Sequence, residues 1–281
     1  MQLKALDTNA ALASAVAAAQ AAGQLMRDNL NLPKRINQST RHDIKLELDV
    51  RCQKRIERGL RKNFPAISVL GEEGVLGDQD APSRWVVDPI DGTVNFTYGI
   101  PHACVSIALQ IRVSTPARAG QIKGRSQPAV PDASPYQTVV GVVYDPFCNE
   151  LWTAIRGGRA RLNGKPIRVS SHGKLEESIV SLGFAKNKAT LGRMLPVFNE
   201  LVHRVRKIRI MGAAALAMVY VASGRMDAYT EYGVRLWDIA AGGLILECAG
   251  GEFWHEAVAG EYTYSICANN GRLRRQLQRF G

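Results

Sequence analysis

The stretch WVVDPIDGTVNF, residues 85–96, joins an apolar run to two acids that stand three residues apart. Residues 84–88 are predicted to form a strand, so Asp88 should emerge at the end of a sheet, where α/β proteins place their sites. Pro89 fixes one φ angle and stiffens the turn, which allows Asp91 to face the same point as Asp88. Gly92 permits a close approach of backbone to a ligand. A helical turn beginning at Gly92 and Thr93 would offer free N–H groups to a phosphate.

Two carboxylates this close repel each other unless a cation lies between them. Mg²⁺ takes oxygen ligands, keeps some waters and shares phosphate oxygens. The alternative is an Asx turn with a helix cap, and the spacing alone favours it. Two further acids move the balance toward a metal: Glu72 follows a β-rich run in GEEG (71–74), and Asp238 opens an apolar helix in LWDIAAGG. A carboxylate in such surroundings must be paired or act as a cap, and Asp238 could do both.

Composition places the 281-residue chain among soluble globular proteins, with 46% apolar and 22% charged residues. Apolar runs stay short of the ~18 residues that a membrane span needs. The alanine-rich segment 11–23 lacks a basic leader and continues at helical spacing, which predicts a helix over 8–30 and not a signal peptide. Five scattered cysteines without a CxxC pair favour reduced thiols and a cytoplasmic protein.

The net charge is +11, and much of the excess lies in the basic runs 156–168, 203–209 and 272–279. Basic proteins attract anions such as nucleic acid, membrane headgroups or small phosphates. None of these runs has interleaved aromatic residues for base stacking, so each is interpreted as a solvated surface. We therefore expect neither a nucleic-acid nor a membrane partner.

Strands and helices alternate along both halves, which predicts an α/β or layered α+β protein. Helices are expected at 8–30, 48–63, 189–206, 212–224 and 237–251. Strands are expected at 84–88, 104–111, 138–146, 178–184 and 226–232, and 66–74 is expected to be a short strand that runs into a polar turn. A hairpin turn is expected at 162–165. The segment 112–137 is predicted to be a long exposed loop. The halves 1–145 and 146–281 carry the two groups of motifs, although no linker composition separates them.

Three motifs in this order resemble those of the inositol monophosphatase family, within the Mg²⁺-dependent, lithium-sensitive sugar-phosphate phosphatases. They are the GEE of 71–73, the DPIDGTVNF of 88–96 and the WDIAAG of 237–242, and the similarity spans nearly the whole chain. The resemblance implies an α+β fold, a layered α/β/α/β/α sandwich shared with fructose-1,6-bisphosphatase. It also implies a homodimer.

The resemblance assigns roles residue by residue. Glu72, Asp88 and the Ile90 carbonyl would hold one Mg²⁺. Asp88, Asp91 and Asp238 would hold a second, and Glu72 would help with a third, weaker ion. Thr93, supported by Asp49, would orient the attacking water together with Glu72. The phosphate would rest on the N–H groups of Gly92 and Thr93, and the alcohol would contact Gly212, Ala213, Ala214 and Glu231.

The chain also departs from the family. Many relatives carry a Val-Thr dipeptide shortly before the helix acid Asp49, whereas this chain has Lys45 and Leu46. We expect Lys45 and Glu47 to face solvent. The 112–137 loop is longer than the usual family connection, and it is expected to hang free and not to cap the site or join an interface.

The expected activity is hydrolysis of a phosphate monoester by metal-activated water, without a covalent intermediate. The residues Thr93 to Phe96 resemble the inositol type within this class, which implies inositol phosphate. Glu231 suits a polyol because a carboxylate accepts hydroxyl hydrogen bonds. Fructose-1,6-bisphosphate, histidinol phosphate and nucleotide 3′,5′-bisphosphate remain as alternatives. The basic runs leave one alternative of another class, a nucleic-acid-associated regulatory protein with an idle site.

Overall fold

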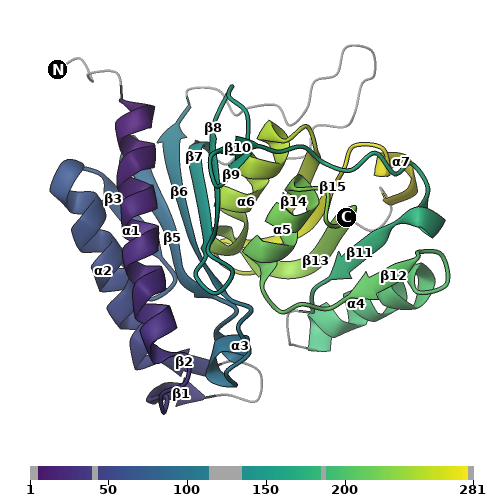
Figure 1. Cartoon of the computed structure of the whole chain (residues 1–281), viewed down its shortest axis with the longest axis horizontal. Coiled ribbons are helices and arrows are strands. Elements are labelled where there is room, and N and C mark those ends of the chain that lie inside the picture. The colour runs from purple at the N-terminus through teal and green to yellow at the C-terminus, as the bar shows by residue number, and fades with distance from the viewer. Residues whose placement is uncertain (1–5, 40–43, 114–134, 185–187, 278–281) are drawn as a thin grey trace.

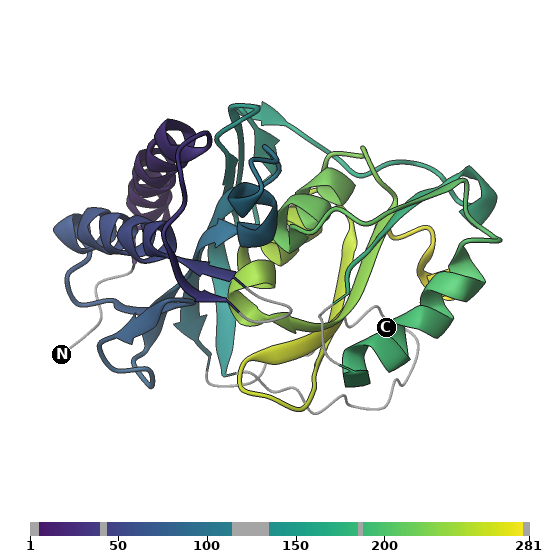
Figure 2. The same cartoon turned by 90° about the horizontal axis from the view of Figure 1, so that it is seen from below.

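The computed structural model describes residues 6–39, 44–113, 135–184 and 188–277, and Figure 1 shows them as five layers. Helices α1 (Thr8–Asn29) and α2 (Glu47–Asn63) cover the outer face of a large sheet. Helices α5 (Ala214–Ala222) and α6 (Leu236–Cys248) lie between this sheet and a smaller one. Figure 2 shows α1 and α2 on one side of the molecule and α4 (Lys188–Leu201) on the far side. The predicted layered α+β sandwich is confirmed.

The large sheet has eight strands in the order β10-β9-β8-β7-β6-β5-β3-β4. They are β3 Ser68–Gly71, β4 Gly74–Leu76, β5 Ser83–Asp91, β6 Cys104–Arg112, β7 Tyr136–Asp145, β8 Glu150–Ile155, β9 Arg161–Leu162 and β10 Lys165–Pro166. Among the described strands of this sheet, only β3 and β5 pair in parallel. Their carboxyl ends therefore lie side by side, which brings the turn at 72–73 next to the end of β5.

The predicted hairpin turn joins β9 to β10, with Asn163 and Gly164 both at positive φ. This sheet continues past residue 145 to Pro166, and the division into halves at 145 stays a prediction. Most of the 112–137 loop lies outside the described residues.

The small sheet has the order β12-β11-β13-β15-β14. Its strands are β11 Ile179–Leu182, β12 Lys207–Arg209, β13 Ala228–Arg235, β14 Glu252–Ala257 and β15 Thr263–Asn269. The predicted helix over 189–206 was too long, because α4 ends at Leu201 and residues 207–209 form β12 beside β11. Strands β14 and β15 were not predicted.

The middle layer depends on close packing of helix against sheet. Helix α6 is apolar on nearly all sides, as expected for a helix buried between two sheets. A Cβ atom at Gly141 of β7 would lie 2.8 Å from the carbonyl oxygen of Ala241, so glycine permits this approach. The packing fixes α6, and with it Asp238, against the large sheet.

The remaining elements are short. They are β1 Ile36–Ser39, β2 Ile44–Leu46, α3 Thr93–Thr97, η1 Leu175–Glu177 and α7 Arg274–Leu277. Asp7 caps α1 through the N–H groups of Asn9 and Ala10, which confirms the predicted helix start. In the part of the chain that the structure describes, no helix is long and apolar enough to cross a membrane.

Candidate active site

Acidic residues from separate elements meet at the carboxyl ends of β3 and β5. The backbone N–H of Glu72 donates to the carbonyl of Val87 at 3.1 Å, which fastens the turn after β3 onto β5. Between Asp88 and Asp91 the pairing of β5 with β6 changes register. Residues three apart in a regular strand point to opposite faces, and such a bulge removes this opposition. Both aspartates are buried, with exposed fractions of 2% and 7%.

Mutual repulsion shows that these carboxylates share one site. Burial and then the charges of Glu72, Asp91 and Asp238 raise the pKa of Asp88 well above its usual range. The pKa of Asp238 is raised by burial and then by Asp91 and Glu72, against the N–H of Arg235, which donates to Asp238 at 2.8 Å. Asp238 therefore caps α6 and also faces the acidic cluster formed with Glu72, Asp88 and Asp91, while its role as a metal ligand stays a prediction.

Asp91 joins the acidic cluster to the start of α5. Its carboxylate accepts hydrogen bonds from the N–H groups of Ala214 at 3.1 Å and Ala215 at 2.8 Å. Burial raises the pKa of Asp91 to about 6, although these two N–H groups act in the opposite direction. The carboxylate thus holds the 212–214 turn, which carries three of the predicted substrate residues, beside the end of β5.

The predicted helical turn after Asp91 is present as α3, which begins at Thr93. Gly92 has φ of +91°, and a Cβ atom there would lie 2.9 Å from the carbonyl oxygen of His102. Only glycine fits this turn without strain. The hydroxyl of Thr93 donates to the Ile90 carbonyl at 2.8 Å and leaves that oxygen a second lone pair.

Asn95 was quoted in the motif, but its role was missed in the sequence. Its side-chain amide donates to the carbonyl of His102 at 3.0 Å and to that of Met211 at 2.9 Å, with a longer contact to Gly212. It therefore ties α3 to the turn before α5, across 116 residues of sequence. The only available signal was an amide two residues after Thr93, which names no partner.

Helix α2 supports the site from the outer layer. Buried Gln53 accepts from the N–H of Glu73 at 2.9 Å and donates to the Gly74 carbonyl at 3.0 Å, so it holds the turn that carries Glu72. Asp49 is also buried, and it accepts from the N–H of Leu46 at 2.7 Å. This N–H belongs to the N-cap, whose side chain makes no capping hydrogen bond because leucine has no acceptor.

Glu47 and Lys45, near Asp49, were both expected to face solvent. Glu47 exposes 44% of its side chain and pairs with Arg35 at 3.7 Å, as expected for a solvent-facing residue. The side chain of Lys45 lies outside what the structure describes.

Glu231 lies on β13 and accepts a hydrogen bond from the hydroxyl of Tyr229. Its charge also raises the pKa of Asp238, so it stands near the acidic cluster. The structure thus brings Glu231 and the turn at Gly212, Ala213 and Ala214 to the same region as the carboxylates. The hydroxyl of Tyr229, which orients Glu231, was not singled out in the sequence.

The donor set fits a hard divalent cation. Among residues 6–39, 44–113, 135–184 and 188–277, no three histidine, cysteine, aspartate or glutamate side chains converge as a ready-made metal cage. The carboxylates nevertheless favour a cation, because the buried acids raise the pKa of Asp88 and Asp238 and need a positive charge between them. Mg²⁺ binds through a few carboxylates plus waters and substrate phosphates, so a closed protein cage is not required.

The layered sandwich and its carboxylate cluster are those expected of a phosphatase. The chain belongs to the inositol monophosphatase family, whose model matches residues 7–117 and 135–276. It is 37% identical over 251 residues to the Nus factor SuhB of Pasteurella multocida, covering 86% of this chain and 84% of the relative. It is 36% identical over 247 residues to inositol monophosphatase 1 of Solanum lycopersicum, covering 85% and 82%.

Solved structures agree with this assignment. The extragenic suppressor protein suhB of Bartonella henselae superposes with a TM-score of 0.82 at 31% identity, covering 96% of this chain and 98% of that one. An inositol monophosphatase of Anabaena (Nostoc) superposes with a TM-score of 0.79 at 31% identity, covering 98% and 96%. Family membership supports a phosphatase, while the names of these relatives do not agree on a substrate.

Proposed function

We propose that the protein hydrolyses a phosphate monoester, most specifically inositol 1-phosphate, with Mg²⁺ as cofactor and water as nucleophile. The observation that carries this proposal is the convergence of Glu72, Asp88, Asp91 and Asp238, whose charges raise the pKa of Asp88 and of Asp238. Unaided hydrolysis of phosphate monoesters is extremely slow, so a site for it must supply strong charge stabilisation.

Two or three Mg²⁺ ions would be held by the acidic cluster. One would bind Glu72, Asp88 and the Ile90 carbonyl, and a second would bind Asp88, Asp91 and Asp238, with Glu72 assisting a third. When bound, such ions lower the pKa of a coordinated water and stabilise the leaving alkoxide. This work leaves no need for a protein nucleophile.

The chain's own groups would position the reactants. Thr93 would orient the attacking water with Glu72, and Asp49 would support Thr93 from the start of α2. The N–H groups of Gly92 and Thr93 would bind phosphate oxygens, since the first turn of a helix leaves such groups unpaired. Asp91 would serve twice, because it also fastens the substrate turn through Ala214 and Ala215.

The alcohol would be bound by Gly212, Ala213, Ala214 and Glu231. Glu231 is restrained by the Tyr229 hydroxyl, so its carboxylate is presented in one orientation. A fixed carboxylate suits a substrate with several hydroxyl groups. This favours a polyol such as inositol over fructose-1,6-bisphosphate, histidinol phosphate or a nucleotide bisphosphate.

Phosphate release from inositol 1-phosphate tests the reaction. The purified protein should release phosphate with Mg²⁺ and not in EDTA. Asp91→Asn should lower kcat by ~10³-fold or more, because several kcal/mol of charge stabilisation depend on the ions. Asp80→Asn is the matched control, since Asp80 exposes 89% of its side chain and should keep full activity. Equal activity in EDTA would overturn the mechanism.

Substrate choice requires a separate measurement. A panel of phosphate esters ranked by kcat/KM should place inositol 1-phosphate first, and Tyr229→Phe should weaken that preference. A higher kcat/KM for another ester would replace the substrate and leave the reaction unchanged. The homodimer and the cytoplasmic location stay predictions, and size-exclusion chromatography with light scattering tests the first.

A further inference from the structure

The outer face of α2 is strongly basic, and its one central acid, Glu57, is half-buried. Apart from Asn63 at its end, the exposed residues of this helix are all basic: Arg51, Lys54, Arg55, Arg58, Arg61 and Lys62. We call these six side chains the α2 basic face. The apolar residues of the helix, such as Ile56 and Leu60, are fully buried against the large sheet.

The α2 basic face is not neutralised by the protein itself. Other basic residues pair with acids, as Arg225 does with Glu150 and Arg156 with Glu247. Within the described ranges, none of the six side chains makes an ion pair. The nearest acid on the helix is Glu57, which accepts from the Gln53 amide at 3.0 Å. The six like charges lie between Arg51 and Lys62, on about three helical turns, and repel one another, so an anionic partner gains from all of them.

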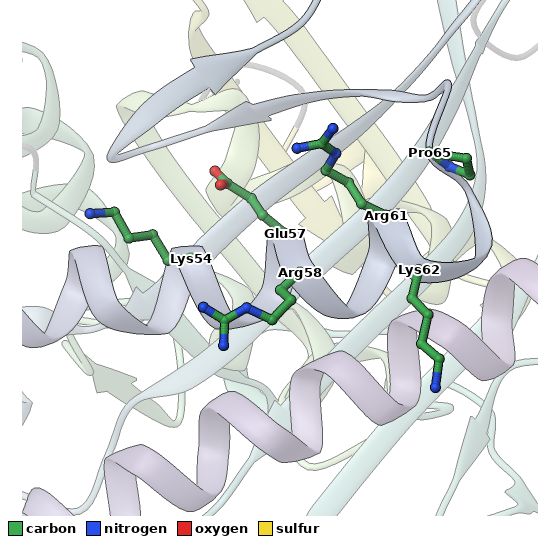
Figure 3. A pocket seen from close by; sticks show the side chains of 6 residues that line it. All are labelled: Lys54, Glu57, Arg58, Arg61, Lys62 and Pro65. Carbon is green, nitrogen blue, oxygen red and sulfur yellow. The ribbon is translucent and has the colours of Figure 1, made fainter.

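Two surface hollows flank this row of charges. One, of about 610 Å³, is lined by Lys54, Glu57, Arg58, Arg61, Lys62 and Pro65. The other, of about 410 Å³, lies between α1 and α2, where Ala17, Ala18 and Ala21 form a floor of small residues. Arg58 and Lys62 line both hollows. Figure 3 shows Arg58 and Lys62 directed toward the neighbouring helix, and Lys54 and Arg61 directed away from it.

We propose that the α2 basic face binds the phosphate backbone of a nucleic-acid duplex without reading its sequence. Residues four apart on a helix rise by ~6 Å, and phosphates follow each other every ~3.4 Å of axis on each strand, so the face presents one cation for about every second phosphate. No aromatic residue lines either hollow, so the stacking that holds single strands is missing.

Other anionic partners fit less well. A membrane-binding helix needs exposed apolar residues to enter the lipid, and α2 buries its own. An acidic protein segment remains an outcome of the test. The basic runs noted in the sequence lie at 156–168, 203–209 and 272–279. The basic residues of α2 are spaced along the sequence, and they come together on one face only when the helix forms.

Salt dependence of binding to a short labelled DNA duplex tests the proposal by fluorescence anisotropy. With about 0.9 released counterions per phosphate contact, six contacts predict a ~10³-fold loss of affinity between about 50 and 200 mM salt. The variant Lys54→Ala/Arg58→Ala/Lys62→Ala should lose only ~40-fold over that range, because it lacks three contacts. Alanine keeps the helix propensity, and an unchanged circular dichroism spectrum and Tm would verify the fold.

A second variant removes the same charge elsewhere. Arg159→Ala/Lys165→Ala/Arg168→Ala deletes three exposed bases of the 156–168 run and should retain the wild-type salt slope. Asp91→Asn should bind the duplex as the wild type does, which separates this surface from the proposed catalysis. The proposal is overturned by an absence of duplex binding, by equal losses in both triple variants, or by tighter binding of polyglutamate or phosphatidylserine vesicles.

Discussion

Without divalent cations, the protein should become less stable as the pH rises from about 4 to about 7. Asp91 supplies the magnitude, because burial raises its pKa from 3.8 to about 6. A group whose pKa is higher in the folded state stabilises that state fully below its unfolded pKa, and this stability is lost as the pH rises through the folded pKa. About two pKa units correspond to ~3 kcal/mol, and Asp88 and Asp238 shift in the same direction.

The assay is urea unfolding at several pH values, in EDTA and in Mg²⁺. In EDTA the free energy of unfolding should fall by ~3 kcal/mol or more across this window. With Mg²⁺ the fall should be much smaller, because bound cations remove the repulsion among the carboxylates. At ~100 times its Kd, a ligand adds ~2.7 kcal/mol of stability. Mg²⁺ should stabilise the protein more at pH 7 than at pH 5, because its carboxylate ligands must be deprotonated.

One titration of opposite sign needs a control. Burial lowers the pKa of His102, so its contribution is present above its ordinary pKa and is lost as the pH falls. The same series in a His102→Gln background removes this effect and should steepen the decline. If stability in EDTA stays flat or increases with pH in both backgrounds, the carboxylates do not repel one another as the structure indicates.

Two substitutions test the scaffold around these acids. Gly92→Ala places a Cβ atom 2.9 Å from the His102 carbonyl and should cost ~2 kcal/mol or more, whereas Gly99→Ala, also at positive φ but with open space around it, should cost less in a thermal melt. Asn95→Ala removes the donor shared by three carbonyls and should cost ~1–3 kcal/mol together with most of the activity. Asn95→Asp should be at least as harmful, because it turns a carboxylate toward those carbonyls; wild-type activity in either Asn95 variant would show that this tie is dispensable.

Local sequence predicted those parts of the fold whose signals are local. The turn after Asp91 depends on Gly92 and Thr93 themselves, and the start of α1 depends on the side chain of Asp7. The end of α4 was wrong for the opposite reason. Residues 202–206 continue a helical pattern, but residues 207–209 pair with β11, whose residues lie far back in the chain. Tertiary pairing outweighed local propensity there.

The candidate site shows the same division. The acids at 72, 88, 91 and 238 could be named from motifs, since each stands in a short and specific pattern. Their supports could not, because Gln53 and Asn95 act on backbone groups of other elements. Polar side chains that bind distant carbonyls leave no periodic signal in the sequence. The α2 basic face was missed for a related reason, since its charges and its buried apolar residues alternate too evenly to appear as a run.

The acids of the cluster are translated at widely separated times. Asp238 leaves the ribosome 147 residues after Asp91. At 5–20 residues per second, a nascent chain spends ~7–30 s with the first three acids made and the fourth absent. The tie from Asn95 to the Met211 carbonyl cannot form earlier than the last fifth of that interval. During this interval the N-terminal layers of the nascent chain hold three acids of the cluster without the helices that complete the site.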